Sequence, residues 1–129
     1  MHNLTALVTC LSLLVFFVMS FLVGRARGQY SIEAPATTGH PMFERAFRVH
    51  YNTMESLTWY LPSLWLFSFY VSDRWAALLG AVWIVGRILY ARTYLADPKS
   101  RGPATIITVG AGAVLLLGAL IGVLVSLVK

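Results

Sequence analysis

Two long segments without a charged residue lie near the two ends of the 129-residue chain, at residues 4–24 and 104–128. A helix needs about 20 consecutive apolar residues to cross the roughly 30 Å hydrocarbon core of a bilayer. The composition agrees, because 58% of the residues are hydrophobic and only 12% are charged, whereas a soluble domain is about a quarter charged. The sequence therefore predicts an integral membrane protein and excludes an ordinary soluble domain, a disordered tail and a fibrous repeat.

Two further apolar segments, at about residues 55–71 and 75–95, lie between the first two. Together the four segments predict an all-α bundle of four transmembrane helices, in one domain over residues 1–129. The second helix is expected to begin outside the hydrocarbon near Met42, after a polar loop with proline and glycine from Ser31 to Pro41. The first segment lacks the basic start of a signal peptide, so we expect it to be retained as a helix.

Basic residues are distributed unevenly along this topology. Four spans bring both chain ends to one side, which holds Arg74 and Lys129. The first and third connections lie on the other side, which holds Arg25, Arg27, Arg45, Arg48, Arg92, Lys99 and Arg101. Positive charge favours the cytoplasmic face, so this second side is expected to face the cytoplasm. The short chain has no evident retrieval signal, and we expect the membrane to be a bacterial inner membrane.

The last apolar segment is rich in glycine, and Gly118 and Gly122 have the small-xxx-small spacing. This spacing allows helix backbones to approach closely in lipid. Glycine is also common in transmembrane helices in general, and the spacing alone does not distinguish the two explanations. Four short helices enclose little interior, so self-association is expected.

Several polar side chains lie in or beside the predicted spans, where a charge without a partner is costly and therefore a functional candidate. One group repeats at i, i+4 and i+7, on one helix face: Arg48, Asn52 and Glu55. Another repeats at i, i+3 and i+7: Arg87, Tyr90 and Tyr94. Both groups fall near the cytoplasmic ends of their spans, with Arg101 close by. Guanidinium groups bind carboxylates in bidentate fashion and Glu55 can hold an ammonium group, so the set suits a zwitterionic ligand with excess negative charge.

Structural explanations exist for some of these residues. Arg48 could pair with Glu44 one turn earlier, and Glu55 with Arg87 could form an ion pair between helices. The two tyrosines could belong to an interfacial aromatic belt. No metal site is expected, because the histidines have no second ligand at metal-binding spacing.

Two motifs resemble the MAPEG family, the membrane-associated proteins of eicosanoid and glutathione metabolism. The first is Glu44-Arg45-x-x-Arg48-x-x-x-Asn52-x-x-Glu55, preceded by Thr37-Thr38-Gly39. The second is Arg87-x-x-Tyr90-x-x-x-Tyr94, followed by Arg101. Length, spans and loop positions agree with the family, so the resemblance covers nearly the whole chain.

The resemblance implies a homotrimer of four-helix subunits that binds glutathione between neighbouring subunits near the cytoplasmic face. Transferred by position, the residues that would hold the tripeptide are Arg27, Arg48, Asn52, Glu55, Tyr90 and Tyr94. His50 stands where the family commonly has a glutamine, and Arg87 joins this binding set from its place in the second motif. Arg101 resembles the arginine that faces the glutathione sulfur, where a guanidinium favours the reactive thiolate.

Departures from the family pattern refine the expected activity. Ser56 replaces an aromatic residue of the eicosanoid enzymes, and Gly28 replaces a basic residue of the first loop. These changes favour a general glutathione transferase for hydrophobic electrophiles over a dedicated leukotriene synthase. Reduction of lipid hydroperoxides is expected as a second activity, together with a role in detoxification. Pro98 is expected to kink the helix that leads from Tyr94 to Arg101.

Two other functions compete with this interpretation. One is a small proton-coupled multidrug exporter with Glu55 as the proton carrier, although Arg48 and Arg87 would repel a cationic substrate. The other is a non-catalytic, lipid-binding member of the same family.

Overall fold

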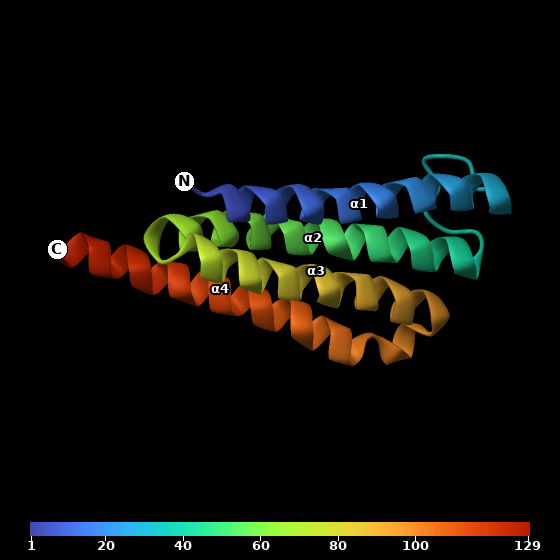
Figure 1. Cartoon of the computed structure of the whole chain (residues 1–129). Helices are drawn as coiled ribbons and strands as arrows, with labels where there is room; N and C mark the ends of the chain where they lie inside the picture. The colour runs from blue at the N-terminus through green and yellow to red at the C-terminus, as the bar shows by residue number, and fades with distance from the viewer.

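The computed structural model describes residues 1–129 and consists of four long α-helices without any strand (Figure 1). The helices are α1 (Asn3–Tyr30), α2 (Pro41–Tyr70), α3 (Asp73–Ala96) and α4 (Gly102–Val128), with a short 3₁₀ turn, η1 (Pro98–Arg101), before α4. The prediction of an all-α bundle is confirmed.

The helices run side by side, and the two connections predicted to share a side do so (Figure 1). Both chain ends and the α2–α3 turn lie at one end of the bundle, here called the terminal end. The loop of residues 31–40 and η1 lie at the other end, the loop end. α1 and α4 both pack against the central pair α2 and α3, so α1 and α4 occupy opposite sides of the bundle.

Three segments are long and apolar enough to cross a membrane: α1, α3 and the segment Pro98–Val128, with mean hydropathy values of 2.7, 1.3 and 2.6. α2 has 30 residues, and a helix of that length would extend about 45 Å. Its first half carries the polar groups of the sequence motif, so α2 does not reach the same mean hydropathy. A fourth span through α2 therefore stays a prediction.

Helix ends follow the local sequence. α1 continues to Tyr30, beyond the predicted end at Gly24, and therefore carries Arg25 and Arg27 on a helix. Pro41 occupies the first turn of α2, where the nitrogen of proline needs no partner, and the His40 ring accepts a hydrogen bond from the Met42 backbone nitrogen.

The predicted kink at Pro98 is wrong, because the helix ends before Pro98 instead of bending there. α3 ends at Ala96, and Asp97 adopts an extended conformation, as expected for a residue before proline. The Asp97 carboxylate accepts a hydrogen bond from the Lys99 backbone nitrogen at 3.1 Å, which stabilises the 3₁₀ turn. Proline thus separates two helices, and Arg101 stands at the start of α4 instead of at the end of α3.

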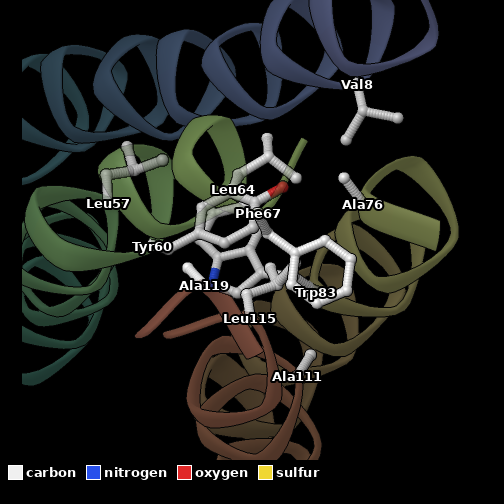
Figure 2. Close-up of a cluster of buried hydrophobic side chains, with 10 residues drawn as sticks. All are labelled: Val8, Leu57, Tyr60, Leu64, Phe67, Ala76, Trp83, Ala111, Leu115 and Ala119. Atoms are coloured by element: carbon white, nitrogen blue, oxygen red, sulfur yellow. The ribbon is translucent and has the colours of Figure 1, made fainter. Parts of the chain in front are cut away.

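Aromatic stacking forms the centre of the bundle (Figure 2). The rings of Tyr60 and Trp83 lie parallel with centroids 4.2 Å apart, and both side chains are completely buried. Leu64 of α2 and Leu115 of α4 complete this layer. Because lipid tails are as apolar as the core, such close packing, more than burial from water, holds transmembrane helices together.

The glycines of α4 serve contacts within the chain. A Cβ atom on Gly118 would lie 2.5 Å from the Phe67 ring, and one on Gly122 would lie 3.0 Å from the Tyr70 side chain. The small-xxx-small spacing therefore allows α2 to pack closely on α4. Of the two explanations offered for these glycines, close helix approach is the one observed, and it occurs inside one copy of the chain.

A hydrogen-bonded group, here called the terminal cluster, closes the terminal end: His2, Thr5, Ser68 and Asp73. The Thr5 hydroxyl lies 2.7 Å from the Asp73 carboxylate and 2.8 Å from the Ser68 hydroxyl. The Thr5 backbone nitrogen also donates to Asp73 at 2.9 Å, and the His2 ring lies 2.6 Å from the Ser68 hydroxyl. A carboxylate of α3 thus caps the N-terminus of α1, where negative charge is favourable.

Candidate functional site

An open groove of about 570 Å³ lies at the loop end between α2, α3 and α4. We call it the main groove. Its polar part includes five of the predicted site residues: Asn52, Glu55, Arg87, Tyr90 and Arg101. Its remaining lining is Ser56, Trp59, Gly102, Thr105, Ile106 and Val109. Predicted site residues as far apart in the sequence as Asn52 and Arg101 therefore meet in one groove.

Arg101 enters this groove from the start of α4. Its guanidinium carbon lies 5.8 Å from the centre of the Tyr94 ring, and the side chain is exposed. The N-terminus of a helix carries partial positive charge, which adds to the charge of the guanidinium. This corner of the groove is therefore suited to an anion.

Asn52 and Tyr90 are joined across the groove. The Asn52 amide nitrogen donates a hydrogen bond to the Tyr90 hydroxyl at 2.7 Å. The bond leaves the phenolic hydrogen of Tyr90 and the amide oxygen of Asn52 available to a ligand. The pair therefore offers one donor and one acceptor at a fixed separation.

Glu55 lines the same groove with an exposed carboxylate. It takes part in none of the side-chain hydrogen bonds of the chain, and its expected structural partner Arg87 is bonded elsewhere. The ion pair between helices that could have explained both residues is not formed. Glu55 is left free to bind a positively charged group of a ligand.

Arg87 is 4% exposed and is held without a carboxylate partner. Its Nε donates to the Thr53 hydroxyl at 2.8 Å, and an Nη lies 3.5 Å from the Thr108 hydroxyl. The guanidinium carbon lies 3.9 Å from the centre of the Tyr90 ring. A guanidinium that has only neutral partners in an apolar bundle is costly to bury, and an anionic ligand in the adjoining groove would offset that cost.

A second groove, of about 370 Å³, adjoins the loop of residues 31–40. It is lined by Thr37, Thr38, Pro41, Glu44, Arg45, Phe47, Arg48 and Tyr94. Tyr94 connects the two grooves, because its ring lies 5.6 Å from that of Tyr90 and also faces Arg101. Glu44 accepts a hydrogen bond from the Gly39 nitrogen at 3.3 Å. Arg48 takes part in none of the side-chain hydrogen bonds of the chain, so the expected pair with Glu44 is not formed.

Arg45 has a structural role beside this second groove. Its guanidinium donates to the backbone oxygens of Leu95 and Ala96 at 3.0 and 3.1 Å. These carbonyls belong to the last turn of α3, where a positive charge is favourable. Arg45 thereby links α2 to the last turn of α3, next to Tyr94.

Two predicted ligand residues lie outside both grooves. Arg27 donates to the Ala36 carbonyl at 2.8 Å and lies over the Phe43 ring at 5.0 Å. His50 stacks on Phe16 of α1, with ring centroids 4.7 Å apart. One copy of the chain therefore does not bring all the predicted site residues together.

Sequence reasoning missed the deeper part of the main groove. Ser56 and Trp59 follow Asn52 at i+4 and i+7, so the helical period that selected Asn52 and Glu55 would also have selected them. Ser56 accepts a hydrogen bond from the Trp83 indole at 3.0 Å. On α4, Thr105 and Val109 follow Arg101 at i+4 and i+8. Thr53 and Thr108, which hold Arg87, gave no such signal, because their partner lies on another helix.

This arrangement, a helical membrane bundle with an arginine-rich groove at one end, agrees with the sequence comparisons. The profile of the MAPEG family matches residues 5–121. The chain belongs to the MAPEG family.

Individual relatives support the same assignment. An uncharacterized protein of Synechocystis sp. is 44% identical over 119 residues, which cover 92% of this chain and 87% of that protein. Human microsomal glutathione S-transferase 2 is 38% identical over 91% of this chain and 80% of its own length. Leukotriene C4 synthase of Cavia porcellus is 36% identical over 76% of this chain and 65% of that enzyme. The two characterised relatives are named for glutathione transfer and leukotriene C4 synthesis.

Proposed function

We propose that this protein is a membrane-bound glutathione transferase that joins the sulfur of glutathione to hydrophobic electrophiles. The observation that carries the proposal is the composition of the main groove: Arg101, Glu55 and Arg87 lie in its polar part, and Trp59, Ile106 and Val109 form an apolar part. Glutathione has two carboxylates, one ammonium group and one thiol. Together with Arg48 of the second groove, the main groove offers a matching set of charges next to a surface for an apolar acceptor.

Each charged group has a counterpart in the ligand. Glu55 would hold the ammonium group of glutathione, and Arg48 and Arg87 would pair with its carboxylates. Arginine is suited to this because its guanidinium makes two parallel hydrogen bonds with a carboxylate. Asn52 and Tyr90 would bind the peptide groups between them through the free donor and acceptor of their pair.

Arg101 would act on the thiol. A free thiol has a pKa of about 8.5, and a neighbouring guanidinium favours the thiolate, which is the nucleophile. The thiolate would attack an electrophilic carbon of the acceptor, so that a carbon–sulfur bond forms and the leaving group takes the electron pair. With a lipid hydroperoxide, the same thiolate would attack the outer oxygen, so that the O–O bond breaks and the lipid leaves as an alkoxide that takes a proton to become the alcohol. Glutathione is left as its sulfenic acid, which a second glutathione converts to the disulfide with release of water.

The acceptor would enter from the bilayer. Trp59, Ile106 and Val109 lie deeper in the helices than Arg101, on the side of α2 and α4 that is open. Gly112 allows this arrangement, because a Cβ atom at that position would lie 2.6 Å from the Trp59 ring. A lipid-soluble electrophile could therefore reach the sulfur without passing through water.

We also propose that three copies assemble and that α2 forms the fourth span of each. The main groove is open along α2 and α4, while Arg27 and His50 lie away from it in their own copy. A neighbouring copy would close the groove and supply these two residues. By the positive-inside rule, the loop end would face the cytoplasm. We propose that the protein resides in a bacterial inner membrane.

The direct test is calorimetric titration of the purified protein in detergent with glutathione and with S-hexyl glutathione. We expect both to bind, and the alkylated form to bind more tightly because its hexyl chain would cover Trp59, Ile106 and Val109. Trp59→Ala should remove most of this difference and leave the affinity for glutathione nearly unchanged. Absence of glutathione binding would refute the proposal, and proton-driven dye efflux that is lost in Glu55→Gln would favour an exporter.

A further inference from the structure

A second surface groove, here called the lipid groove, lies between α1 and α3, and it is separate from the main groove. It has a volume of about 380 Å³ and is lined by Leu14, Val15, Val18, Met19, Leu22, Ile88, Ala91, Arg92 and Leu95. All but one of these residues are hydrophobic. The residues that line it on α1 extend over about two turns, which is roughly 12 Å along the helix axis.

The floor of this groove reaches into the bundle. A small cavity of about 20 Å³ shares Met19, Leu22, Ala91 and Leu95 with it and is closed on the inner side by Val49 of α2. Three helices thus form a concave apolar surface, where most lipid-facing helix surfaces are convex. The small side chain of Ala91 leaves the space over this floor open.

Positive charge is placed at one end of the groove only. Arg92 is exposed and lines the half of the groove nearer the loop end, about one turn before Leu95. Arg25 is also exposed, and it follows Leu22, Val18 and Leu14 at i+3, i+7 and i+11, so it lies on the same face of α1. Neither arginine takes part in a side-chain hydrogen bond of the chain, in contrast to Arg27 and Arg45, which bind backbone carbonyls.

From this geometry we propose that the lipid groove binds one anionic phospholipid. An acyl chain lies along α1 and α3 over Ala91, and the phosphate group lies between Arg92 and Arg25 at the loop end. The concave apolar surface binds the acyl chain. The two guanidinium groups give the preference for a negatively charged headgroup. Arginine pairs readily with phosphate oxygens, and basic residues at the membrane surface attract anionic lipids.

The test is native mass spectrometry of the detergent-purified protein with added phosphatidylglycerol or phosphatidylcholine of identical acyl chains. We expect phosphatidylglycerol to be retained preferentially, and Arg92→Gln to weaken its retention about fivefold. Arg74→Gln is the matched control, because it removes an exposed arginine from the other end of the same helix. Equal retention of the two lipids, or equal effects of the two substitutions, would overturn the proposal.

A second variant tests the groove itself. Ala91→Leu is expected to fill the space over the floor and to reduce the retention of both lipids without changing the mass of the protein assembly. If Ala91→Leu changes the assembly and leaves lipid retention unaltered, a second copy of the chain covers this surface and the proposal is wrong. If Ala91→Leu fails to fold, Arg92→Gln still tests the proposal, because Arg92 is exposed and substitutions of exposed residues change stability little.

Discussion

The two ends of the bundle both contain polar side chains, but these side chains have opposite roles at the two ends. At the terminal end, Thr5, Ser68 and Asp73 satisfy one another, and the carboxylate caps a helix. At the loop end, Glu55 and Arg101 face an open groove and make no side-chain hydrogen bond. Polar groups that hydrogen-bond to one another stabilise a membrane protein, whereas polar groups without a partner in the protein remain able to bind a ligand. The comparison predicts that substitutions at the loop end will change glutathione binding or transfer, and that substitutions at the terminal end will change the stability of the fold.

The largest effect is expected for Arg101→Ala. Removing a group that stabilises developing or resident negative charge typically lowers kcat by about 10²–10³-fold. We therefore expect a loss of this size in glutathione transfer, together with loss of the ultraviolet thiolate band that glutathione should give when bound. Lys99→Ala is the control, because Lys99 belongs to the same 3₁₀ turn and does not line either groove. A fully active Arg101→Ala variant with an unchanged thiolate band would remove Arg101 from the mechanism.

Glu55→Gln is expected to weaken glutathione binding by roughly 10- to 100-fold, because a hydrogen bond to a charged group contributes about 1.5–3 kcal/mol. The side chain keeps its size, and Glu55 is exposed, so thermal stability should not change. Calorimetric titration measures the first quantity and a thermal unfolding curve the second. Glu33→Gln in the exposed loop should change neither. A large loss of stability in Glu55→Gln would show that Glu55 has a structural role, like the residues of the terminal cluster.

Thr5→Val should have the opposite pattern. The substitution conserves the shape of a completely buried side chain and leaves Ser68 and Asp73 without their shared partner, at a cost of about 1–3 kcal/mol. We expect a lower unfolding free energy in mixed detergent and no change in glutathione affinity. Thr9→Val is the matched control, because the Thr9 hydroxyl bonds only to a carbonyl one turn earlier in the same helix. Equal destabilisation by the two variants would contradict a special role for the terminal cluster.

The smallest effect is expected for Ser72→Ala, which removes the cap of α3. The Ser72 hydroxyl accepts a hydrogen bond from the Trp75 nitrogen at 3.3 Å, and loss of such a cap costs about 1 kcal/mol. The unfolding midpoint should fall slightly while glutathione transfer stays unaltered. Ser126→Ala, on an exposed position of α4, should have no effect. A change in turnover with Ser72→Ala would link the two ends of the bundle and weaken the contrast between them.

Much of the fold follows from the sequence alone. The sequence predicts four helices from the apolar segments of membrane length, the proline-containing loop and the helical repeats. Four helices that cross in turn place the first and third connections at the same end. These signals are local in the sequence. The same periodicity selects Asn52 with Glu55 and Arg87 with Tyr90. Because these pairs lie one turn or less from each other on their helices, they stay together whatever the rest of the bundle does.

The tertiary structure decided which of these groups meet. The rotation of each helix about its axis depends on the packing of all four, through contacts such as Tyr60 on Trp83 and Phe67 on Gly118. That rotation places Arg101 and Glu55 in the same groove and puts Arg48 in the adjoining groove.

Partners on other helices were equally inaccessible to the sequence. It gave no sign that Thr53 and Thr108 would hold Arg87, or that Asp73 would cap a helix beginning 70 residues earlier. A periodic pattern determines which side chains share a face of a helix, because neighbours along one helix have fixed geometry. It does not determine what that face meets, because the facing surface is built by distant parts of the chain.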